Sequence, residues 1–293
     1  MTAVSEERPI AAVPGKVRPS REAVIAKLIS DDRRRRRLAG PRSVGMIVLS
    51  IVGVLVVWWL VVVVFQIPRF VLPNPVEVLQ QFVGSIPLLA EEAVPTLQEV
   101  LIGFAITVAV FVPVGVLIAS SRVFEGFVNP LLVISQSTPM IAFAPLLITA
   151  FGYSIVPKVV MVVLIAFFPV VVNTVVGIKS VSQDVVDLGR SMGASNAKML
   201  LKVRLPAALP SIFAGLRVAI TLSVIGAVVG EYAGADAGLG RLIVVASGRL
   251  NTPLVFATVI ALAIIGLVLY KLVELAEWAS LPWHRDKRGR PGR

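Results

Sequence analysis

The chain has 293 residues, of which 57% are hydrophobic, above the roughly 45–50% that is usual in soluble domains. It contains no Cys and one His, which excludes disulfide and thiol chemistry and leaves almost nothing from which a metal site could be built. The formal charge of +11 favours an anionic partner, either nucleic acid or membrane lipid. We therefore expect an integral membrane protein.

Residues 1–43 form a polar tail that ends in the arginine run Arg33–Arg37. Such a composition predicts disorder. An arginine run directly before an apolar span favours a cytoplasmic anchor near anionic lipid over a nucleic-acid site. The apolar run starts only at Val44 and is too long for a secretory signal peptide.

Six apolar segments follow, each near the roughly 20 residues that a membrane-spanning helix needs. They predict spans at about 44–65, 97–119, 127–150, 155–176, 211–230 and 253–276. The third contains Pro130, Pro139 and Pro145, so we expect it to be kinked and packed against other helices. The predicted fold class is all-α, a polytopic membrane protein with six transmembrane helices. Its transmembrane domain covers 44–276, and a basic tail covers 277–293.

The basic residues indicate the orientation in the membrane. Of the 28 Lys and Arg residues, 23 fall on the side of the two termini and the loop 177–210, and 4 fall on the opposite side. The positive-inside rule therefore predicts cytoplasmic termini and a cytoplasmic 177–210 loop, as in a multi-pass protein of a bacterial cell membrane. Basic residues gathered at membrane edges, without interleaved aromatics, also argue against nucleic acid as a partner.

The loop between the fourth and fifth spans has the pattern of two short amphipathic helices. Gly193 separates them, which suits a turn with positive φ. Ser195 is placed to cap the second helix, and we expect Pro206 to stop it. The two apolar faces comprise Val185, Leu188, Gly189 and Met192 in the first helix, and Met199, Leu200 and Val203 in the second.

The spacing Asp187-x5-Gly193-x9-Val203-x-Leu205-Pro206 resembles the cytoplasmic loop of ATP-binding-cassette (ABC) importer permeases. In that family the loop reads Glu-Ala-Ala-x3-Gly-x9-Ile-x-Leu-Pro, so Asp187 replaces Glu and Leu188-Gly189 replace the two alanines. The resemblance implies a coupling helix that docks into a cleft on an ATPase subunit. The implied coupling residues are Asp187, Gly193, Met199, Leu200, Val203, Leu205 and Pro206.

Other stretches are similar to the sulfonate, taurine, nitrate and thiamine-precursor group of these permeases. They include Ser137-Thr138-Pro139, Phe167-Phe168-Pro169, and Gly230-Glu231 followed by Gly238-Leu239-Gly240, within roughly 95–275. The resemblance implies a type I importer permease fold, a homodimer, two cytoplasmic ATPase subunits and an extracytoplasmic solute-binding protein. The implied solute is a small anion such as taurine or nitrate, or a heterocycle such as a thiamine precursor or riboflavin. The Phe-Gly-x3-Val-Pro-Lys and Phe-Phe-Pro stretches favour the heterocycle.

The sequence has no G-x-x-x-x-G-K-[ST] phosphate loop, no Ser/His/Asp constellation and no metal-ligand spacing. We therefore expect no catalytic residues, no metal and no cofactor, with ATP bound by a partner subunit. The alternative is a secondary transporter or channel driven by an ion gradient, which would use carboxylates within the membrane. The acids near span depth, Glu99, Glu231 and Glu274, fall at span edges, which disfavours this alternative.

Polar residues at membrane depth are candidates for a solute path. An unpaired polar group there costs on the order of a kcal/mol or more, so Gln136, Ser137 and Thr138 must face protein or water. Asn173 is a further candidate. Hydrogen bonding between helices explains all four equally well.

Three other positions carry structural or contact hypotheses. Arg217, two turns into its span, is interpreted as snorkelling or structurally paired. Glu231, at the outer edge of the fifth span, is a candidate contact for the binding protein or for a basic group. Gly226-x3-Gly230 predicts close packing of two helices.

Overall fold

The structure, a computed structural model, describes residues 41–281. Residues 1–40 and 282–293, which hold most of the two predicted tails, lie outside this range. The chain divides after Val64 into two units, which are described separately. All regular structure between residues 41 and 281 is helical, as the composition predicts.

The first unit contains α2 (Pro41–Val64), a single apolar helix that covers the first predicted span. Its Val-rich stretch has no charged residue after Arg42. The segment Leu49–Val64 alone is apolar enough for a membrane but shorter than a full span.

The second unit begins with α3 (Pro75–Gly84), a short helix that the sequence analysis did not predict. Asn74 caps it by accepting a hydrogen bond from the Val76 amide, and Pro75 starts it. The helices that follow are α4 (Ile86–Ser120), α5 (Arg122–Ser137), a 3₁₀ turn (Met140–Ala142), α6 (Phe143–Phe151), α7 (Ile155–Lys179), α8 (Gln183–Ser191), α9 (Asn196–Met199), a π-helical turn (Leu200–Arg204), α10 (Leu205–Ala233), α11 (Leu239–Gly248) and α12 (Thr252–Ser280).

Four helical stretches of the described chain are long and apolar enough to cross a membrane: α4, α7, Asn196–Ala233 and α12. A fifth is present if α5 and α6 form one broken span. The third predicted span is therefore not one continuous helix, because the chain bends by 78° between α5 and α6. Thr138 precedes Pro139 and is extended (φ −93°, ψ 127°), since a residue before proline is disfavoured in the helical region. The count of six spans remains a prediction.

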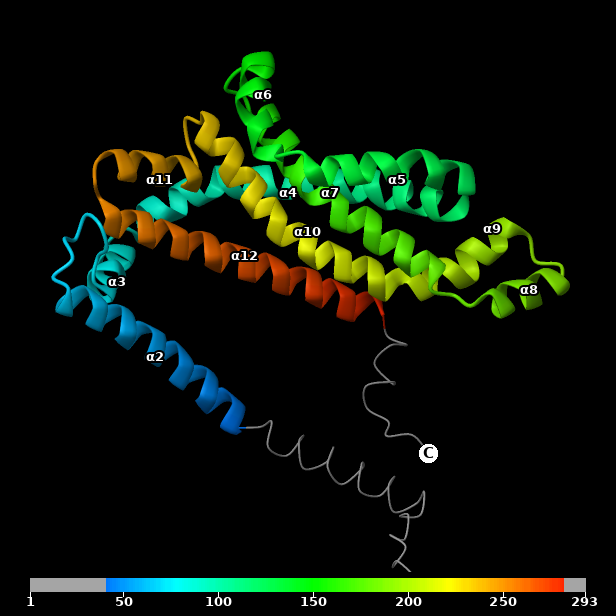
Figure 1. Cartoon of the computed structure of the whole chain (residues 1–293), viewed down its shortest axis with the longest axis horizontal. Helices are drawn as coiled ribbons and strands as arrows, with labels where there is room; N and C mark the ends of the chain where they lie inside the picture. The colour runs from blue at the N-terminus through cyan, green and yellow to red at the C-terminus, as the bar shows by residue number, and fades with distance from the viewer. Residues whose placement is uncertain (1–40, 282–293) are drawn as a thin grey trace, which may run out of the picture. The chain divides into compact units, whose positions relative to one another are not determined.

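The core of the second unit lies between α7 and α10, which pack closely along their length (Figure 1). Glycines on α10 make this approach possible. A β-carbon on Gly226 would lie 2.7 Å from the Cα atom of Val162, and one on Gly230 would lie 2.9 Å from the Cα atom of Lys158. The predicted close packing at Gly226-x3-Gly230 is confirmed.

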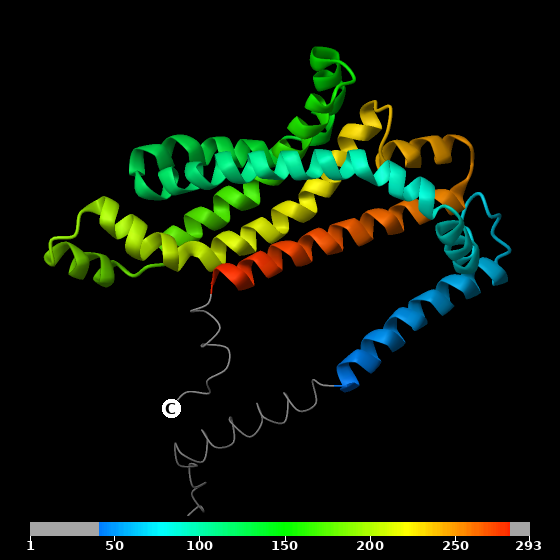
Figure 2. The same cartoon turned by 180° about the vertical axis from the view of Figure 1, so that it is seen from behind.

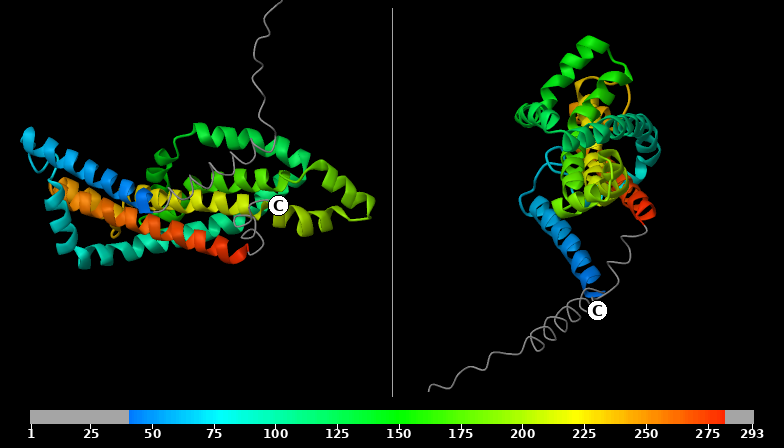
Figure 3. Two further views of the ribbon diagram at one scale, coloured as in Figure 1. Left: turned by 90° about the horizontal axis from the view of Figure 1, so that it is seen from below. Right: turned by 90° about the vertical axis from the view of Figure 1, so that its right-hand side faces the viewer.

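Two further helices pack on this pair. α4 runs along α7, with Gly103 and Gly115 at the contact, and can be followed in Figure 2. α12 runs beside α10, and α11 packs between α4 and α12 through Leu239 and Leu242. Figure 3 shows the α8–α9 loop at one end of this unit, the end opposite to α11.

Candidate functional site: the α8–α9 loop and the polar cluster at α11

The turn between α8 and α9 has the geometry of a Schellman motif. The Gly193 amide donates to the Arg190 carbonyl at 2.9 Å, and the Ala194 amide donates to the Gly189 carbonyl at 3.0 Å. Gly193 has a φ of +79°, as the sequence predicts. Nothing lies within 4 Å of a β-carbon built on Gly193, so its backbone conformation, and not a lack of space, requires glycine here.

The second helix starts as predicted but does not end as predicted. Ser195 caps α9, since its hydroxyl oxygen accepts a hydrogen bond from the Lys198 amide at 3.3 Å. Pro206, however, does not stop the helix, and the expectation that it would is wrong. The chain widens into a π-helical turn at Leu200–Arg204 and continues into α10, where Pro206 falls in the first turn. At this position the missing amide hydrogen of proline is tolerated.

The loop buries one side of α8 and leaves another side exposed. Val186 is buried, and Met199 is 4% exposed and packs against Gly189. In contrast, Leu188 is 62% exposed and Met192 is 79% exposed. We call the exposed row of Val185, Leu188 and Met192 the apolar stripe of α8.

The remaining predicted coupling residues lie outside this stripe. Asp187 is exposed, accepts a hydrogen bond from Gln183 at 3.0 Å and pairs with Arg190 at 3.6 Å. Four others, in the π-helical turn and the start of α10, are half-buried: Leu200, Val203, Leu205 and Pro206.

At the opposite end of the unit, Glu231 belongs to a buried polar cluster. Its side chain is 1% exposed, so in this structure it is not accessible to a binding protein. The Thr96 hydroxyl donates to its Oε1 atom at 2.6 Å, and the Gly240 amide donates to its Oε2 atom. Glu231 therefore joins α10 to α4 and to the first turn of α11.

The first turn of α11 receives two more hydrogen-bond partners from α4. The Gly238 amide donates to Glu92 Oε2 at 2.6 Å, and the Leu239 amide donates to the Thr96 hydroxyl at 2.9 Å. Carboxylates at a helix N-terminus satisfy its free amides and complement its dipole. β-Carbons on Gly238 and Gly240 would collide with the Glu231 carboxylate. A residue larger than glycine therefore does not fit at either position without a shift of its neighbours.

A buried ion pair lies next to this cluster. The Lys158 ammonium at the start of α7 is 3.0 Å from Glu99 Oε1 on α4, and Glu99 is 1% exposed. From the sequence, Glu99 and Glu231 were predicted separately at span edges, and no role was predicted for Lys158 or Thr96. The signal that could have joined them is the presence of three charged residues near the ends of three neighbouring spans, on the side of α11.

The four solute-path candidates do not come together. Gln136 and Ser137 are exposed at the end of α5, and half-buried Thr138 lies at the bend. Asn173 instead lies between α7 and α10, where its amide donates to the Pro169 carbonyl at 2.8 Å and its β-carbon faces Gly215. This position favours a packing role for Asn173.

Arg217 is structurally paired, as predicted. Its guanidinium is 3.4 Å from Glu277 Oε2, which connects α10 to α12. Both side chains are mostly buried. A second ion pair lies at the end of α7 that leads into the α8–α9 loop. There the Lys179 ammonium is 2.6 Å from Glu125 Oε1, in the first turn of α5.

An all-helical membrane unit with broken and glycine-packed spans and a projecting amphipathic loop is the architecture expected of a transport permease. Residues 111–277 match the family described as "Binding-protein-dependent transport system inner membrane component". This match covers more than half of the chain. The chain belongs to this family, and it is a multi-pass membrane permease subunit of an ABC importer.

Curated relatives agree with this assignment. The chain is 40% identical over 227 residues to a "Probable ABC transporter permease protein" of Haemophilus influenzae, covering 77% of this chain and 93% of that one. It is 36% identical to a riboflavin transport system permease protein of Chloroflexus aurantiacus, with coverages of 80% and 88%. It is 34% identical to a formylaminopyrimidine transport permease protein of Halalkalibacterium halodurans, with coverages of 74% and 88%.

A solved structure supports the fold. An inward-facing form of the MetNI methionine ABC transporter matches with a TM-score of 0.55 at 19% identity, covering 63% of this chain and 92% of that one. The predicted type I importer permease fold is confirmed. The family is a non-catalytic membrane component that works with an ATPase partner and a binding protein.

Proposed function

We propose that the α8–α9 loop is the element through which an ABC ATPase subunit drives this permease. The observation that carries this proposal is the apolar stripe of α8, which projects from the end of the unit with no covering element in the described chain. Exposed apolar patches outside a membrane mark contact sites with other proteins. An ATPase subunit is the occupant because the family works with one.

The predicted coupling residues then have distinct tasks. Asp187 is exposed on α8, on a different side of the helix from the stripe, and is available to a partner. Gly193 sets the angle between the two helices, and Met199 holds them together from inside. Leu200, Val203, Leu205 and Pro206 form the half-buried joint through which movement of the loop reaches α10.

We further propose that two copies of the permease assemble with two ATPase subunits. The exposed end of α5 supports this. α5 buries none of its own residues, and Gln136 is exposed at membrane depth. Because a glutamine amide facing hydrocarbon is costly, this face is expected to meet a second copy across a wet solute path.

The orientation and the solute complete the proposal. The charge asymmetry supports cytoplasmic termini and a cytoplasmic α8–α9 loop in a bacterial cell membrane. In this orientation the solute is delivered to the α11 end from outside the cytoplasm.

For the solute we propose a small heterocycle of the riboflavin or pyrimidine type. The relatives named for riboflavin and formylaminopyrimidine, at 36% and 34% identity, support this over the taurine permease of Escherichia coli, at 29%.

Co-purification tests the ATPase coupling. The full-length permease is expressed with its ATPase, and the retained ATPase is measured for wild type, Leu188→Glu and Ser182→Glu. Leu188→Glu places a charge in the apolar stripe and is expected to lose the ATPase. Ser182→Glu adds the same charge at the exposed N-cap of α8, away from the stripe and at a side chain without a capping hydrogen bond, and is expected to retain it. Equal retention by both variants would show that the stripe is not the docking surface.

A further inference from the structure

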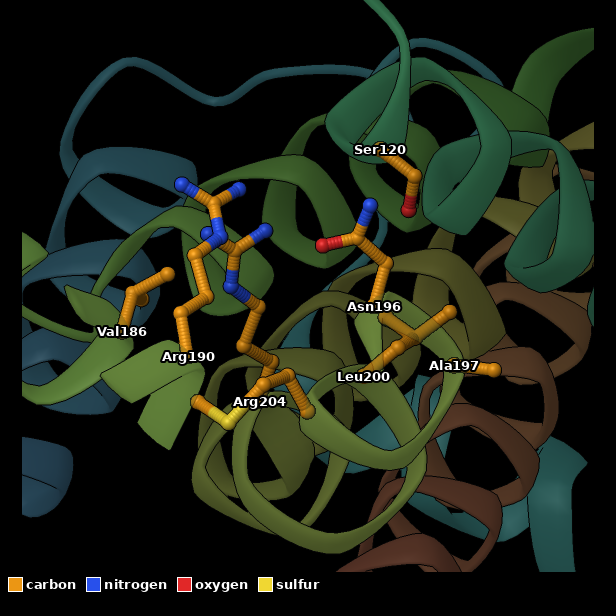
Figure 4. A pocket seen from close by; sticks show the side chains of 8 residues that line it. Ser120, Val186, Arg190, Asn196, Ala197, Leu200 and Arg204 are labelled. Atoms are coloured by element: carbon orange, nitrogen blue, oxygen red, sulfur yellow. The ribbon is translucent and has the colours of Figure 1, made fainter. Parts of the chain in front are cut away.

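A cavity of about 230 Å³ lies between the α8–α9 loop and the end of α4. Figure 4 shows the side chains of Arg190 and Arg204 extending to one side of this cavity. The Asn196 side chain lies opposite them with its oxygen toward the arginines, and Ser120 lies beyond it. Val186 and Met199 form part of the apolar wall. The described residues that line the cavity include two cations and no acid.

The hydrogen-bonding capacity of the two arginines is largely unused. The Nε atom of Arg204 is buried and has no hydrogen-bond partner in the structure. A buried donor without an acceptor is unfavourable, because it has lost its water without a replacement. Arg190 has only an exposed contact with Asp187, at 3.6 Å. An anion in the cavity would satisfy both guanidinium groups.

We propose that this cavity binds a phosphate group, either on an anionic phospholipid headgroup or as a free phosphate ion. A guanidinium presents a planar fork of donors that matches two oxygens of a phosphate. Two such forks, one from α8 and one from the π-helical turn before α10, suit a tetrahedral anion. The Ser120 hydroxyl already donates to the Val116 carbonyl at 2.7 Å, so it is not counted among the donors for the anion.

The position of the cavity favours a phosphate over an acidic side chain of the ATPase. Val186 and Arg190 are four residues apart and share the side of α8 that faces the cavity. The apolar stripe lies on a different side of the same helix. The cavity also adjoins the last residue of α4 and the residue before α10, two helices that are long and apolar enough to cross a membrane. In the proposed orientation these are the cytoplasmic ends of both helices, which would bring the cavity near the anionic headgroups of the cytoplasmic leaflet.

A bound phosphate would fix the loop to the membrane-crossing helices. It would bridge Arg190 on α8 to Arg204 at the start of α10, and it would reduce the repulsion between the two cations. The angle of the loop, and therefore the transfer of movement to α10, would then depend on occupancy of this cavity. Phosphate binding here does not depend on how the ATPase docks.

Binding measurements on the purified full-length chain test the proposal. Native mass spectrometry in detergent measures retention of phosphatidylglycerol and of phosphatidylcholine, and calorimetry measures binding of inorganic phosphate. The wild type is expected to bind phosphatidylglycerol or phosphate. The variant Arg190→Gln/Arg204→Gln is expected to lose at least about tenfold in that affinity. Lys202→Gln removes one charge from the same loop outside the cavity and is expected to bind as the wild type does.

Each outcome decides the proposal. Preference for phosphatidylglycerol over phosphatidylcholine identifies a lipid as the source, and binding of inorganic phosphate alone identifies a free ion. No binding by the wild type overturns the proposal, and so does equal loss in Lys202→Gln, which would indicate a general charge effect. If the double variant does not fold, the same binding measurements are made on Arg190→Gln alone. This single variant changes only an exposed side chain. A double variant that loses only its ATPase, with phosphate and lipid binding unchanged, would assign the arginines to the partner protein instead.

Discussion

The thioether sulfur of Met199 lies against Gly189, in the space that a β-carbon on Gly189 would occupy. This contact joins α8 to the start of the helix that becomes α10. Met199 therefore acts inside the loop, where it fixes the relative position of two helices. The apolar stripe that a partner can reach lies on α8 and its C-cap residue Met192.

Replacing Gly189 tests the contact between Gly189 and Met199. Gly189→Val is expected to displace Met199 and separate α8 from α9, because its side chain needs the volume that the thioether fills. The membrane-inserted helices should be unaffected, since the loop lies outside them. The measurement is retention of the ATPase subunit during purification, which should fall.

A second substitution provides the control for that change. Met199→Ala removes the displaced side chain, so the double variant Gly189→Val/Met199→Ala should recover part of the lost ATPase retention. No recovery would show that valine acts through something other than the Met199 contact.

Much of the fold was predictable because hydrophobic length and proline positions act locally. The spans at α7, α10 and α12, the positive φ of Gly193 and the cap at Ser195 follow from the sequence. The continuation of the helix through Pro206 was not predictable, because a π-helical turn depends on the neighbouring helices and not on local propensity.

The polar cluster around Glu231 was not predicted, for a different reason. Thr96 and Glu231 are 135 positions apart in sequence, and only the packing of α4 against α10 brings them together. Single-span patterns give no information on such a pairing. In the same way, the apolar periodicity of α8 and α9 identified the residues of each face but not which face would be covered.

The turn itself is tested by two substitutions at Gly193. Gly193→Val is expected to misdirect the second helix, since left-handed backbone geometry costs roughly 1–2 kcal/mol in residues with a β-carbon. Gly193→Asn should be tolerated, because asparagine adopts this region more readily and the surrounding space is open. Solute-stimulated ATP hydrolysis of the assembled transporter should fall for valine and be retained for asparagine. Equal activity of the two variants would refute a conformational role for this glycine.

The packing of α11 on Glu231 is tested by matched alanine substitutions. A β-carbon on Gly240 would lie 2.6 Å from Glu231 Oε2 and 3.0 Å from the Val228 carbonyl oxygen, so Gly240→Ala forces a shift in a filled site. Such overpacking typically costs about 1–3 kcal/mol. Gly248→Ala on the same helix meets no atom within 4 Å and should not destabilise the protein. Thermal unfolding of the purified chain should show a lower transition temperature for Gly240→Ala only.

The orientation is tested by single cysteines, because the chain has none of its own. Asp236→Cys and Glu91→Cys lie at exposed positions near the α11 end, and Lys198→Cys is exposed in the α8–α9 loop. An impermeant thiol reagent applied to intact cells should label the first two and not the third. Labelling of Lys198→Cys from outside would reverse the orientation and place the loop away from cytoplasmic ATP.

The bend between α5 and α6 is the place where a solute path is best tested. Gln136 is exposed, and the Thr138 hydroxyl donates to its own helix at the Ile134 carbonyl at 3.0 Å, so neither side chain bonds to another helix in the described chain. This arrangement favours contact with water or solute over a structural hydrogen bond. Gln136→Leu should therefore lower solute uptake while leaving insertion and ATPase retention intact.

A matched position separates this effect from a general change in polarity. Thr149 on α6 also donates to its own helix, at the Pro145 carbonyl at 3.0 Å. It is exposed, as Gln136 is, but it lies beyond the bend. Thr138→Val and Thr149→Val remove the same hydroxyl from these two positions. If Gln136 and Thr138 line the path, uptake should fall for Gln136→Leu and Thr138→Val and remain near wild type for Thr149→Val. Normal uptake in both Gln136→Leu and Thr138→Val would assign the polar residues at the bend to helix packing, because a wet path would not tolerate the loss of both polar groups.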